Sequence, residues 1–410
     1  MSADKKTPGV ASATKDQVGV KATDNYTLDV KLENPTPYFL SLMAFQTYMP
    51  VRQDVIEAHP NDWAVNAATY ISNGPFTLKK WLPKERFELV KNKYYWNKDK
   101  VKLEKLNLSV YDDVTSYMSA YQTGQIDIID TPPVQQTTSL LKQGKAKTYP
   151  TLGVEYYAFN LDIAKATKIS PNAAKVMQNV NVRKAISLAI DRTSLVKDIT
   201  KSGENPATSF VPKGIVGPDG KDFKQKNYYK STADLTQAKK LLSDAGYPEG
   251  RGFPDLELLY NSAEKNQNVA EAVQNMIKKN LNINVVLRAV ERKVQLSNTT
   301  IHDYVFSRNG WTADYSDPMT FLDMWTTTSG NNIAGYSNKD YDKLIADAKL
   351  ETNVTKRFTE LHQAQDILLK DMPVVPLYER TVVVCTKDYV KGVYRTPMDQ
   401  VYFVNAYVQK

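Results

Sequence analysis

The sequence predicts an α/β protein, and three observations support this fold class. Residues 256–260 and 283–290 are apolar runs of strand length, and residues 264–279 between them repeat apolar side chains at helical spacing. A strand, a helix and a strand in this order form a βαβ unit, which implies a parallel sheet with a right-handed crossover. A further strand at 303–306 runs into a predicted polar loop, residues 307–318. At 410 residues, the chain is long enough for two or three domains.

The first 150 residues predict several strands and one helix. Residues 1–20 are polar and loop-like. Residues 76–78 and 87–90 predict a hairpin, because two apolar runs flank a long turn. Residues 114–123 have helical spacing and stop at Gly124, a residue type that often ends helices. The other strands predicted in this region are 26–32, 106–110 and 126–129.

The rest of the chain predicts helices that alternate with strands. A Tyr-rich strand at 154–159 precedes a polar loop that extends through Gln178, and an amphipathic helix follows at 182–199. A second helix, at 232–245, ends at Gly246. Beyond the polar segment, the predicted helices are 319–325, 341–348 and 357–369, and the predicted strands are 374–377, 382–385 and 401–408.

Composition and charge argue against several classes of function. The net charge is +8, but Lys and Arg are spread evenly, which favours a solvated basic surface over a nucleic-acid-binding face. Attraction to an anionic membrane surface is a secondary interpretation. The three histidines, His59, His302 and His362, lack metal-ligand spacing, and Cys385 lies in an apolar run typical of an inert thiol. The sequence therefore predicts no metal and no cofactor.

Signals for membrane insertion and export are also missing from the sequence. No run reaches the ~18 apolar residues that a membrane span needs. The first residues are polar and lack the apolar core of an export signal, so no such signal is visible in this chain.

The segment 307–318 contains the chemistry of a binding site. Gly310 exposes backbone, Trp311 offers a large aromatic surface, and Asp314 supplies a carboxylate. A carboxylate beside exposed backbone suits a ligand with an ammonium group and peptide-like donors and acceptors. Asp314 and Asp317 have the spacing of a catalytic pair, but a turn followed by a helix cap is the more common explanation of this spacing before a proline. The segment therefore indicates binding rather than catalysis.

Residues 310–323 (GWTADYSDPMTFLD) closely resemble a loop of bacterial oligopeptide-binding proteins, the extracytoplasmic receptors of peptide ABC importers. Further matches occur in the same order and cover nearly all of residues 20–410. They are 72–76 (SNGPF), 181–192 (NVRKAISLAIDR), 238–247 (AKKLLSDAGY) and 341–345 (YDKLI). The resemblance implies a two-lobed, Venus-flytrap fold of the periplasmic-binding-protein type II, with an extra domain.

The resemblance implies a role for four positions in the matched segment. Asp314 is expected to pair with the α-ammonium of a peptide. The main chain of Gly310 and Thr312 is expected to pair with the peptide backbone as an added strand, and Trp311 to line a side-chain pocket. Core packing is the alternative for Trp311.

Arg308 matches a family arginine that meets the C-terminal carboxylate of longer peptides. The residues alone leave another explanation open, an ion pair of Arg308 with Asp303 or Asp314. The resemblance to the family therefore implies that Arg308 contacts the ligand, whereas an ion pair within the protein would also explain an arginine at this position.

Three further positions are expected near the ligand because of the resemblance. Tyr156 and Tyr157 fall on the strand that crosses into the second lobe. Asn266 aligns weakly with a position where one relative has a histidine that meets the C-termini of shorter peptides.

The resemblance also implies a domain division. Residues 1–48 would be a remnant of the extra domain, 49–152 with 382–410 lobe I, and 153–381 lobe II. Family members carry an export signal, in many cases a lipid anchor, and a further N-terminal segment ahead of the matched region. The sequence resembles an N-terminally truncated member, which is expected to bind peptide weakly or not at all alone.

The implied function is extracytoplasmic binding of oligopeptides, in the periplasm or as a cell-surface lipoprotein, by a monomer that delivers them to a membrane ABC permease. Neither catalysis nor nucleic-acid binding is expected. Dipeptides, signalling peptides, nickel chelates or sugars are alternative ligands for the same architecture. A peptidase and a basic nucleic-acid-binding or surface-adhesion protein are the alternatives from other classes.

Overall fold

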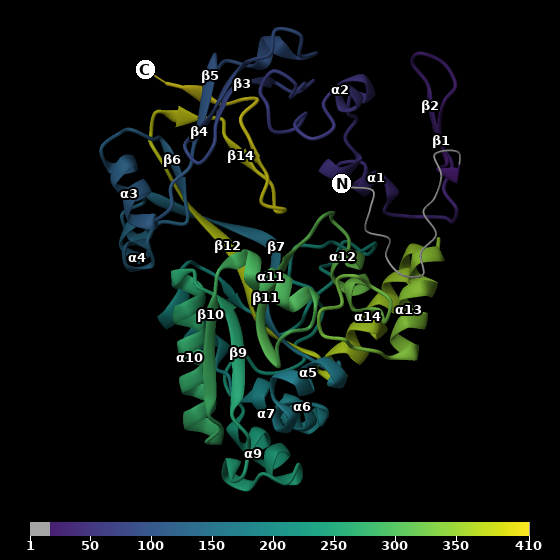
Figure 1. The fold of residues 1–410 in the computed structure, drawn as a ribbon, viewed down its shortest axis with the longest axis vertical. Coiled ribbons are helices and arrows are strands. Elements are labelled where there is room, and N and C mark those ends of the chain that lie inside the picture. Colours follow the sequence, from purple (N-terminus) through teal and green to yellow (C-terminus); the bar gives the residue numbers. More distant parts are fainter. Residues whose placement is uncertain (1–16, 410) are drawn as a thin grey trace.

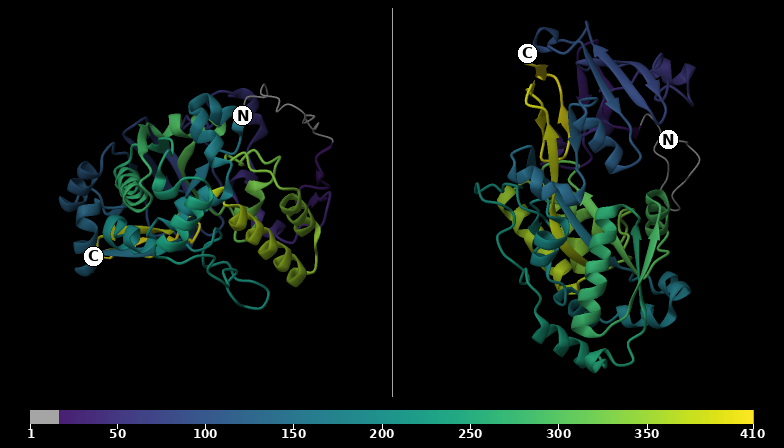
Figure 2. Two further views of the ribbon diagram at one scale, coloured as in Figure 1. Left: turned by 90° about the horizontal axis from the view of Figure 1, so that it is seen from below. Right: turned by 90° about the vertical axis from the view of Figure 1, so that its left-hand side faces the viewer.

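The computed structural model describes residues 17–409, so most of the polar stretch predicted at 1–20 lies outside the described residues. Figure 1 shows an α/β architecture with an upper part of strands and a larger lower part that holds most of the helices. Two long antiparallel neighbours, β7 (Ala146–Phe159) and β12 (Val374–Thr386), run from one part into the other. The right-hand view of Figure 2 shows the same connection from the side.

The largest sheet of residues 17–409 has seven strands. Along the sheet the order is β10-β9-β11-β7-β12-β6, and β8 pairs with β12. The bounds are β6 Ile128–Asp130, β8 Asn205–Pro206, β9 Leu256–Asn261, β10 Val285–Val290 and β11 Phe306–Thr312. β9 and β10 are parallel, with Leu256 opposite Val285, and helix α10 (Glu264–Leu281) connects them. The predicted βαβ unit is therefore confirmed.

The other helices of the lower part surround this sheet (Figure 1). They are α5 (Ile163–Ile169), α6 (Pro171–Met177), α7 (Val180–Leu188), α8 (Arg192–Ser194), α9 (Leu235–Asp244), α11 (Arg292–Thr300), α12 (Met319–Leu322), α13 (Lys339–Leu350) and α14 (Val354–Asp371). A π-helical turn, Leu195–Thr200, follows α8, and a 3₁₀ turn, Asp323–Trp325, follows α12.

Apolar side chains cover both faces of the large sheet, and β7 contributes to each. Tyr157 packs edge-on against Phe306 on the face covered by α7, α9 and α10. Val154 and Tyr156 pack on the opposite face, with Trp325 and residues of α13 and α14. Successive side chains of a strand point to opposite faces, so β7 is apolar almost throughout its second half.

Two predictions before residue 200 are wrong, one of a loop and one of a long helix. The predicted loop through Gln178 contains the helices α5 and α6, which are too short to show a strong apolar repeat. The side chain of Asp162 caps α5 by accepting a hydrogen bond from the N–H of Lys165. The predicted helix at 182–199 ends at Leu188, because the Asp191 side chain accepts the N–H of Ser194 and starts a new helix.

The upper part contains a three-stranded antiparallel sheet. Its strands are β3 (Phe76–Leu82), β4 (Arg86–Lys91) and β5 (Lys105–Ser109), so the predicted hairpin and the strand at 106–110 are confirmed. Helix α3 (Val114–Gln122) occupies the predicted range, whereas α4 (Val134–Lys142) was not predicted.

The remaining elements of the upper part are short. They are β1 (Val20–Ala22), β2 (Leu28–Val30), α1 (Phe39–Leu42), α2 (Gln53–Ala58), β13 (Val390–Lys391), β14 (Tyr394–Arg395), β15 (Val401–Tyr402) and β16 (Tyr407–Val408). The prediction of one strand at 401–408 is wrong, because β15 and β16 pair with two different strands, β14 and β13.

The strands predicted at 374–377 and 382–385 form one continuous strand, β12. Its pairing with β7 shifts register between Pro376 and Tyr378 and again between Glu379 and Thr381. The predicted lobe boundaries at 152 and 381 both fall within this paired region and stay a prediction. Among the described residues, no helix combines the length and apolar character that a membrane span requires.

Candidate ligand-binding site

The segment predicted as a loop at 307–318 begins as a strand. β11 starts at Phe306, where the predicted strand at 303–306 was expected to end, and continues to Thr312. Pairing with β7 runs over the whole of β11, with Gly310 opposite Glu155. This part of the prediction is wrong, because pairing with a long buried neighbour overrides a local sequence that is polar and contains glycine.

β11 has one open edge in the part of the chain that the structure describes. Its other neighbour, β9, pairs with β11 only at Phe306 and Ser307. The N–H of Ala313 bonds to Leu152 on the β7 side. Odd and even residues of a strand direct their N–H and C=O groups to opposite edges, so Gly310 and Thr312 direct theirs to the edge beyond β9. An extended chain can add to this edge as a strand.

The carboxylate of Asp314 lies two residues beyond the end of β11. Its side chain is half-buried, and burial raises the pKa of Asp314 above its ordinary value. No cation among residues 17–409 pairs with this carboxylate, although its own N–H is held by the hydroxyl of Thr320. A partly desolvated carboxylate without a cation is electrostatically suited to an ammonium group from a ligand.

Asp317 has a structural role, as its spacing predicted. Its carboxylate accepts two hydrogen bonds from Arg357, at 2.7 and 2.8 Å, and a third from the N–H of Met319 at the start of α12. Arg357 is buried, and its guanidinium also lies over the ring of Tyr38. Asp317 is therefore unavailable to a ligand, and the loop around Asp314 is anchored to α14.

Trp311 and Thr312 are both half-buried beside Asp314. The indole N–H of Trp311 donates to the hydroxyl of Thr320, and the ring packs against the cluster that contains Trp325. The hydroxyl of Thr312 accepts a hydrogen bond from Arg380 at 2.8 Å. The protein therefore covers both side chains only in part.

Arg308 pairs with neither of the aspartates considered from the sequence. Its Nε contacts the carboxylate of Glu155, and Asp303 instead pairs with Arg288. Burial is the largest influence on the pKa of Arg308 and lowers it, but the charge and hydrogen bond of Glu155, with the nearby Tyr378 and Tyr157, together raise this pKa above its ordinary value. Glu155 is thus a site residue that the sequence reasoning missed, together with Arg380; the available signal was a single carboxylate inside an apolar strand.

Asn266 and Arg308 are connected by hydrogen bonds to a third residue, Asn261. The side chain of Asn261 accepts hydrogen bonds from Arg308 at 3.2 Å and from Asn266 at 2.9 Å. The weakly supported position 266 therefore does lie in the same polar network as the β11 residues.

The structure places the two predicted tyrosines in the cores rather than at an open surface. Tyr156 packs edge-on against Phe210 and Trp325. Tyr157 is fully buried against Phe306, and its hydroxyl has no hydrogen-bond partner among the described residues. Contact of either tyrosine with a ligand stays a prediction.

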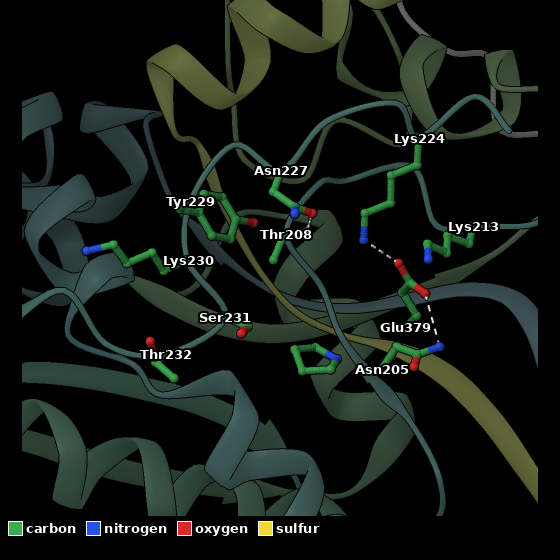
Figure 3. A pocket seen from close by; sticks show the side chains of 11 residues that line it. Asn205, Thr208, Lys213, Lys224, Asn227, Tyr229, Lys230, Ser231, Thr232 and Glu379 are labelled. Carbon is green, nitrogen blue, oxygen red and sulfur yellow. Dashed lines mark hydrogen bonds and ion pairs between the residues drawn. The ribbon is translucent and has the colours of Figure 1, made fainter.

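A separate pocket of about 790 Å³ contains none of the predicted site residues (Figure 3). Its carboxylate, Glu379, faces Lys224, and the lysine Nζ lies 2.7 Å from the glutamate oxygen. Both side chains are nearly buried, so this carboxylate is already neutralised. Asp314, and not Glu379, is therefore the candidate for an ammonium ligand. Among the residues described, no group of three or more His, Cys, Asp or Glu side chains is placed to hold a metal ion.

The space above Gly310 is filled by the Glu155 carboxylate. A Cβ atom at position 310 would lie 2.8 Å from Oε2 of Glu155, closer than such atoms approach. We expect Gly310→Ala to destabilise the protein by about 1–3 kcal/mol, because Glu155 is held by an arginine and cannot move freely. A fall of several degrees in melting temperature, measured by calorimetry, checks this.

The control for that substitution is Gly330→Ala, since a Cβ at this exposed position meets nothing within 4 Å. We expect its unfolding free energy to stay within about 0.5 kcal/mol of the parent. Equal melting temperatures for the two variants would show that Glu155 does not occupy the space above Gly310.

Comparisons with known proteins agree on one family. The family model described as bacterial extracellular solute-binding proteins, family 5, middle, matches residues 1–333. The chain is 36% identical over 403 residues to the oligopeptide-binding protein OppA of Bacillus subtilis, a match that covers 96% of this chain and 71% of that protein.

Solved structures give the same result for the fold. An oligopeptide-binding protein from Borrelia burgdorferi matches with a TM-score of 0.84 at 31% identity, over 97% of this chain and 76% of that one. OppA of Listeria monocytogenes, solved with a bound peptide, matches with a TM-score of 0.81 at 33% identity, over 96% and 75% of the two chains. The predicted two-lobed fold is confirmed by these matches.

Proposed function

Because the chain belongs to the family 5 bacterial extracellular solute-binding proteins, we propose that it binds peptides outside the cytoplasm and delivers them to a membrane ABC permease for import. Similar proteins carry names that specify oligopeptides, a dipeptide and a murein peptide. The shared property of these ligands is a peptide backbone, and the site has groups suited to it.

A single observation supports peptide binding most strongly. The half-buried carboxylate of Asp314 has no cation among the described residues and lies beside the open edge of β11 at Gly310 and Thr312. Every unmodified peptide offers an ammonium group followed by alternating backbone donors and acceptors. A receptor that uses only these features accepts many sequences.

The site would bind the side chains of the ligand with less selectivity than its ammonium group and backbone. Trp311 offers a half-exposed aromatic face, and water can bridge polar groups in a roomy pocket at small cost. Ligand contacts of Arg308, Asn266, Tyr156 and Tyr157 belong to this proposal as well. Oligopeptides are the favoured cargo; dipeptides or signalling peptides are the alternatives within the same site.

The protein's cellular setting follows from the same assignment. We expect a monomer in the periplasm or on the cell surface, with a lipid anchor as one means of attachment. The bound peptide is expected to leave chemically unchanged. Mass spectrometry of peptides after incubation with the protein would detect cleavage, and cleavage products would favour the alternative of a peptidase.

The test of peptide binding is calorimetric titration with a short peptide and its N-acetylated form. We expect the free peptide to bind more tightly, because acetylation removes the charge that Asp314 neutralises. Affinity should fall as the pH is lowered toward the raised pKa of Asp314, where the carboxylate gains a proton. It should fall again above about pH 8, where the peptide ammonium loses its proton.

The N-acetyl peptide is the control for both effects. It should show weak binding without the two-sided pH dependence. Equal affinity of both peptides over the whole pH range would contradict ammonium capture. The test uses the ratio of the dissociation constants of the free and the N-acetylated peptide. This ratio tests ammonium capture whether the protein binds peptides tightly or weakly.

A further inference from the structure

The pocket of about 790 Å³ that Figure 3 shows contains none of the residues assigned to peptide binding. Most of its lining comes from the long connection between β8 and α9, residues 207–234, and the rest comes from β8 and β12. A pocket of this size can enclose a small organic molecule. Its own chemistry therefore indicates what it can bind.

The lining of this pocket carries more positive than negative charge. It contains Lys213, Lys224 and Lys230, but its only carboxylate is that of Glu379. Lys224 and Glu379 neutralise each other at 2.7 Å. Lys230 lies 3.0 Å from Asp234, whereas Lys213 has no ion pair among the residues that the structure describes. The excess of positive charge favours a negatively charged ligand.

A buried cation lies behind one wall of the pocket. The guanidinium of Arg192 is 4.3 Å from the ring centre of Tyr229, which lines the pocket. Arg192 is 1% exposed, and it donates to backbone carbonyls and to one hydroxyl but pairs with no carboxylate within residues 17–409. Its charge is therefore not neutralised by a neighbouring anion, and it adds to the positive potential on this side.

The hydroxyl of Tyr229 is a buried donor. It makes no hydrogen bond of ordinary geometry in the described part of the chain. Burial raises the pKa of Tyr229 to about 12, although the charge of Arg192 opposes the rise. The hydroxyl consequently keeps its proton at neutral pH and can donate it to an acceptor of a ligand.

Other donors point in the same direction. Figure 3 shows Nζ of Lys224, the side-chain amide of Asn227 and the hydroxyl of Tyr229 directed toward the middle of the pocket. An ammonium group has three donors, and Glu379 accepts only one of those of Lys224. The amide oxygen of Asn227 accepts the hydroxyl of Thr208, which leaves its NH₂ group for a ligand. A group rich in acceptor oxygens would satisfy these donors together.

Phosphate has the required combination of negative charge and three strong acceptor oxygens. Lysine binds phosphate as a compact point charge, whereas carboxylates are more often held by the paired donors of arginine. The lining includes three lysines and no arginine. A phosphate group alone would fill a small part of the pocket, and the remaining wall includes the hydroxyl-bearing Ser231 and Thr232.

We propose that this pocket is a second ligand site, which binds the phosphate group of a small phosphomonoester between Lys213, Lys224 and Tyr229. The hydroxyl groups of Ser231 and Thr232 would contact a polyhydroxylated organic part of the same molecule. This site goes beyond the proposed peptide binding and does not depend on it.

The test is calorimetric titration of the whole protein with glycerol phosphate, a phosphomonoester, at constant ionic strength. We expect a dissociation constant of about 1 mM or lower. Inorganic phosphate, which lacks the organic part, should bind at least about threefold more weakly, and succinate, a carboxylate probe, at least about tenfold more weakly. No binding of glycerol phosphate up to about 10 mM would overturn the proposal. Tighter binding of succinate would contradict the choice of phosphate, and equal binding of inorganic phosphate would contradict the choice of an ester.

Two variants test the residues of the site. Lys213 is exposed, and Tyr229→Phe removes a hydroxyl without an ordinary hydrogen bond, so Lys213→Gln and Tyr229→Phe should both fold. Each should weaken glycerol phosphate binding by at least about fivefold. Lys221→Gln removes an exposed lysine of the same connection, outside the pocket lining, and should change the affinity by less than about twofold. Full affinity in either test variant would overturn the proposal.

Asp314→Asn separates this site from the peptide site. It should bind glycerol phosphate as tightly as the parent does, because Asp314 does not line the pocket. Loss of glycerol phosphate binding in Asp314→Asn would place this ligand at the peptide site and contradict a second site. A parent protein that binds glycerol phosphate but no free-amine peptide would support the second site and contradict only the proposed peptide binding.

Discussion

Asp314→Asn should weaken the binding of free-amine peptides by about 2–5 kcal/mol, or roughly 30- to 4,000-fold in the dissociation constant. The substitution keeps the shape of the side chain and removes its charge. The peptide ammonium would then enter a half-desolvated position without the charge of Asp314, because the nearby carboxylate of Asp323 is already paired with Lys349. Isothermal titration with a tripeptide measures the change.

The control for this variant is Asp340→Asn, which neutralises an exposed aspartate at the start of α13 in the same part of the molecule. It should change peptide affinity by less than about twofold, since exposed charges are screened by solvent and salt. N-acetylated peptide should bind the parent and Asp314→Asn equally. A loss of affinity in Asp340→Asn as large as in Asp314→Asn would point to net charge rather than to ammonium capture.

Arg357→Leu should have the largest effect on stability, a loss of about 3–5 kcal/mol in the free energy of unfolding. The Arg357 side chain is 2% exposed and holds Asp317 with two hydrogen bonds, so its removal leaves a buried carboxylate unpaired. Nε also donates to the carbonyl of Ala348, which would lose its partner. Urea unfolding followed by circular dichroism measures the change.

Two comparisons test the cause of that loss. Arg357→Leu/Asp317→Leu removes both charges and should be more stable than the single variant, because no unpaired charge is buried. Arg251→Leu breaks an exposed pair with Glu249 and should cost less than about 1 kcal/mol. A cost below 1 kcal/mol for Arg357→Leu would mean that the Asp317 loop is not held by this ion pair.

Several features were predictable because their signals are local. The βαβ unit of β9, α10 and β10 follows from apolar periodicity, and the hairpin of β3 and β4 from two apolar runs around a turn. The capping role of Asp317 follows from its place before Pro318 and α12. In each case, neighbouring residues contain enough information to define the structure.

Other features depend on contacts between distant segments, which a single sequence does not display. β11 continues through Gly310 because β7, about 150 residues earlier, pairs with it. Glu155 pairs with Arg308 for the same reason, so Asp303 and Asp314 were the only partners that proximity in sequence suggested. The contact of Arg380 with Thr312 was not predicted, because β12 approaches β11 only through its pairing with β7.

The most direct test of ammonium capture is a crystal structure of the protein with a bound tripeptide. We expect the peptide nitrogen to lie within about 3 Å of the Asp314 carboxylate, with the ligand backbone paired to Gly310 and Thr312 as an added strand. A bound peptide whose amino end points away from Asp314, or that lies away from the open edge of β11, would contradict the account.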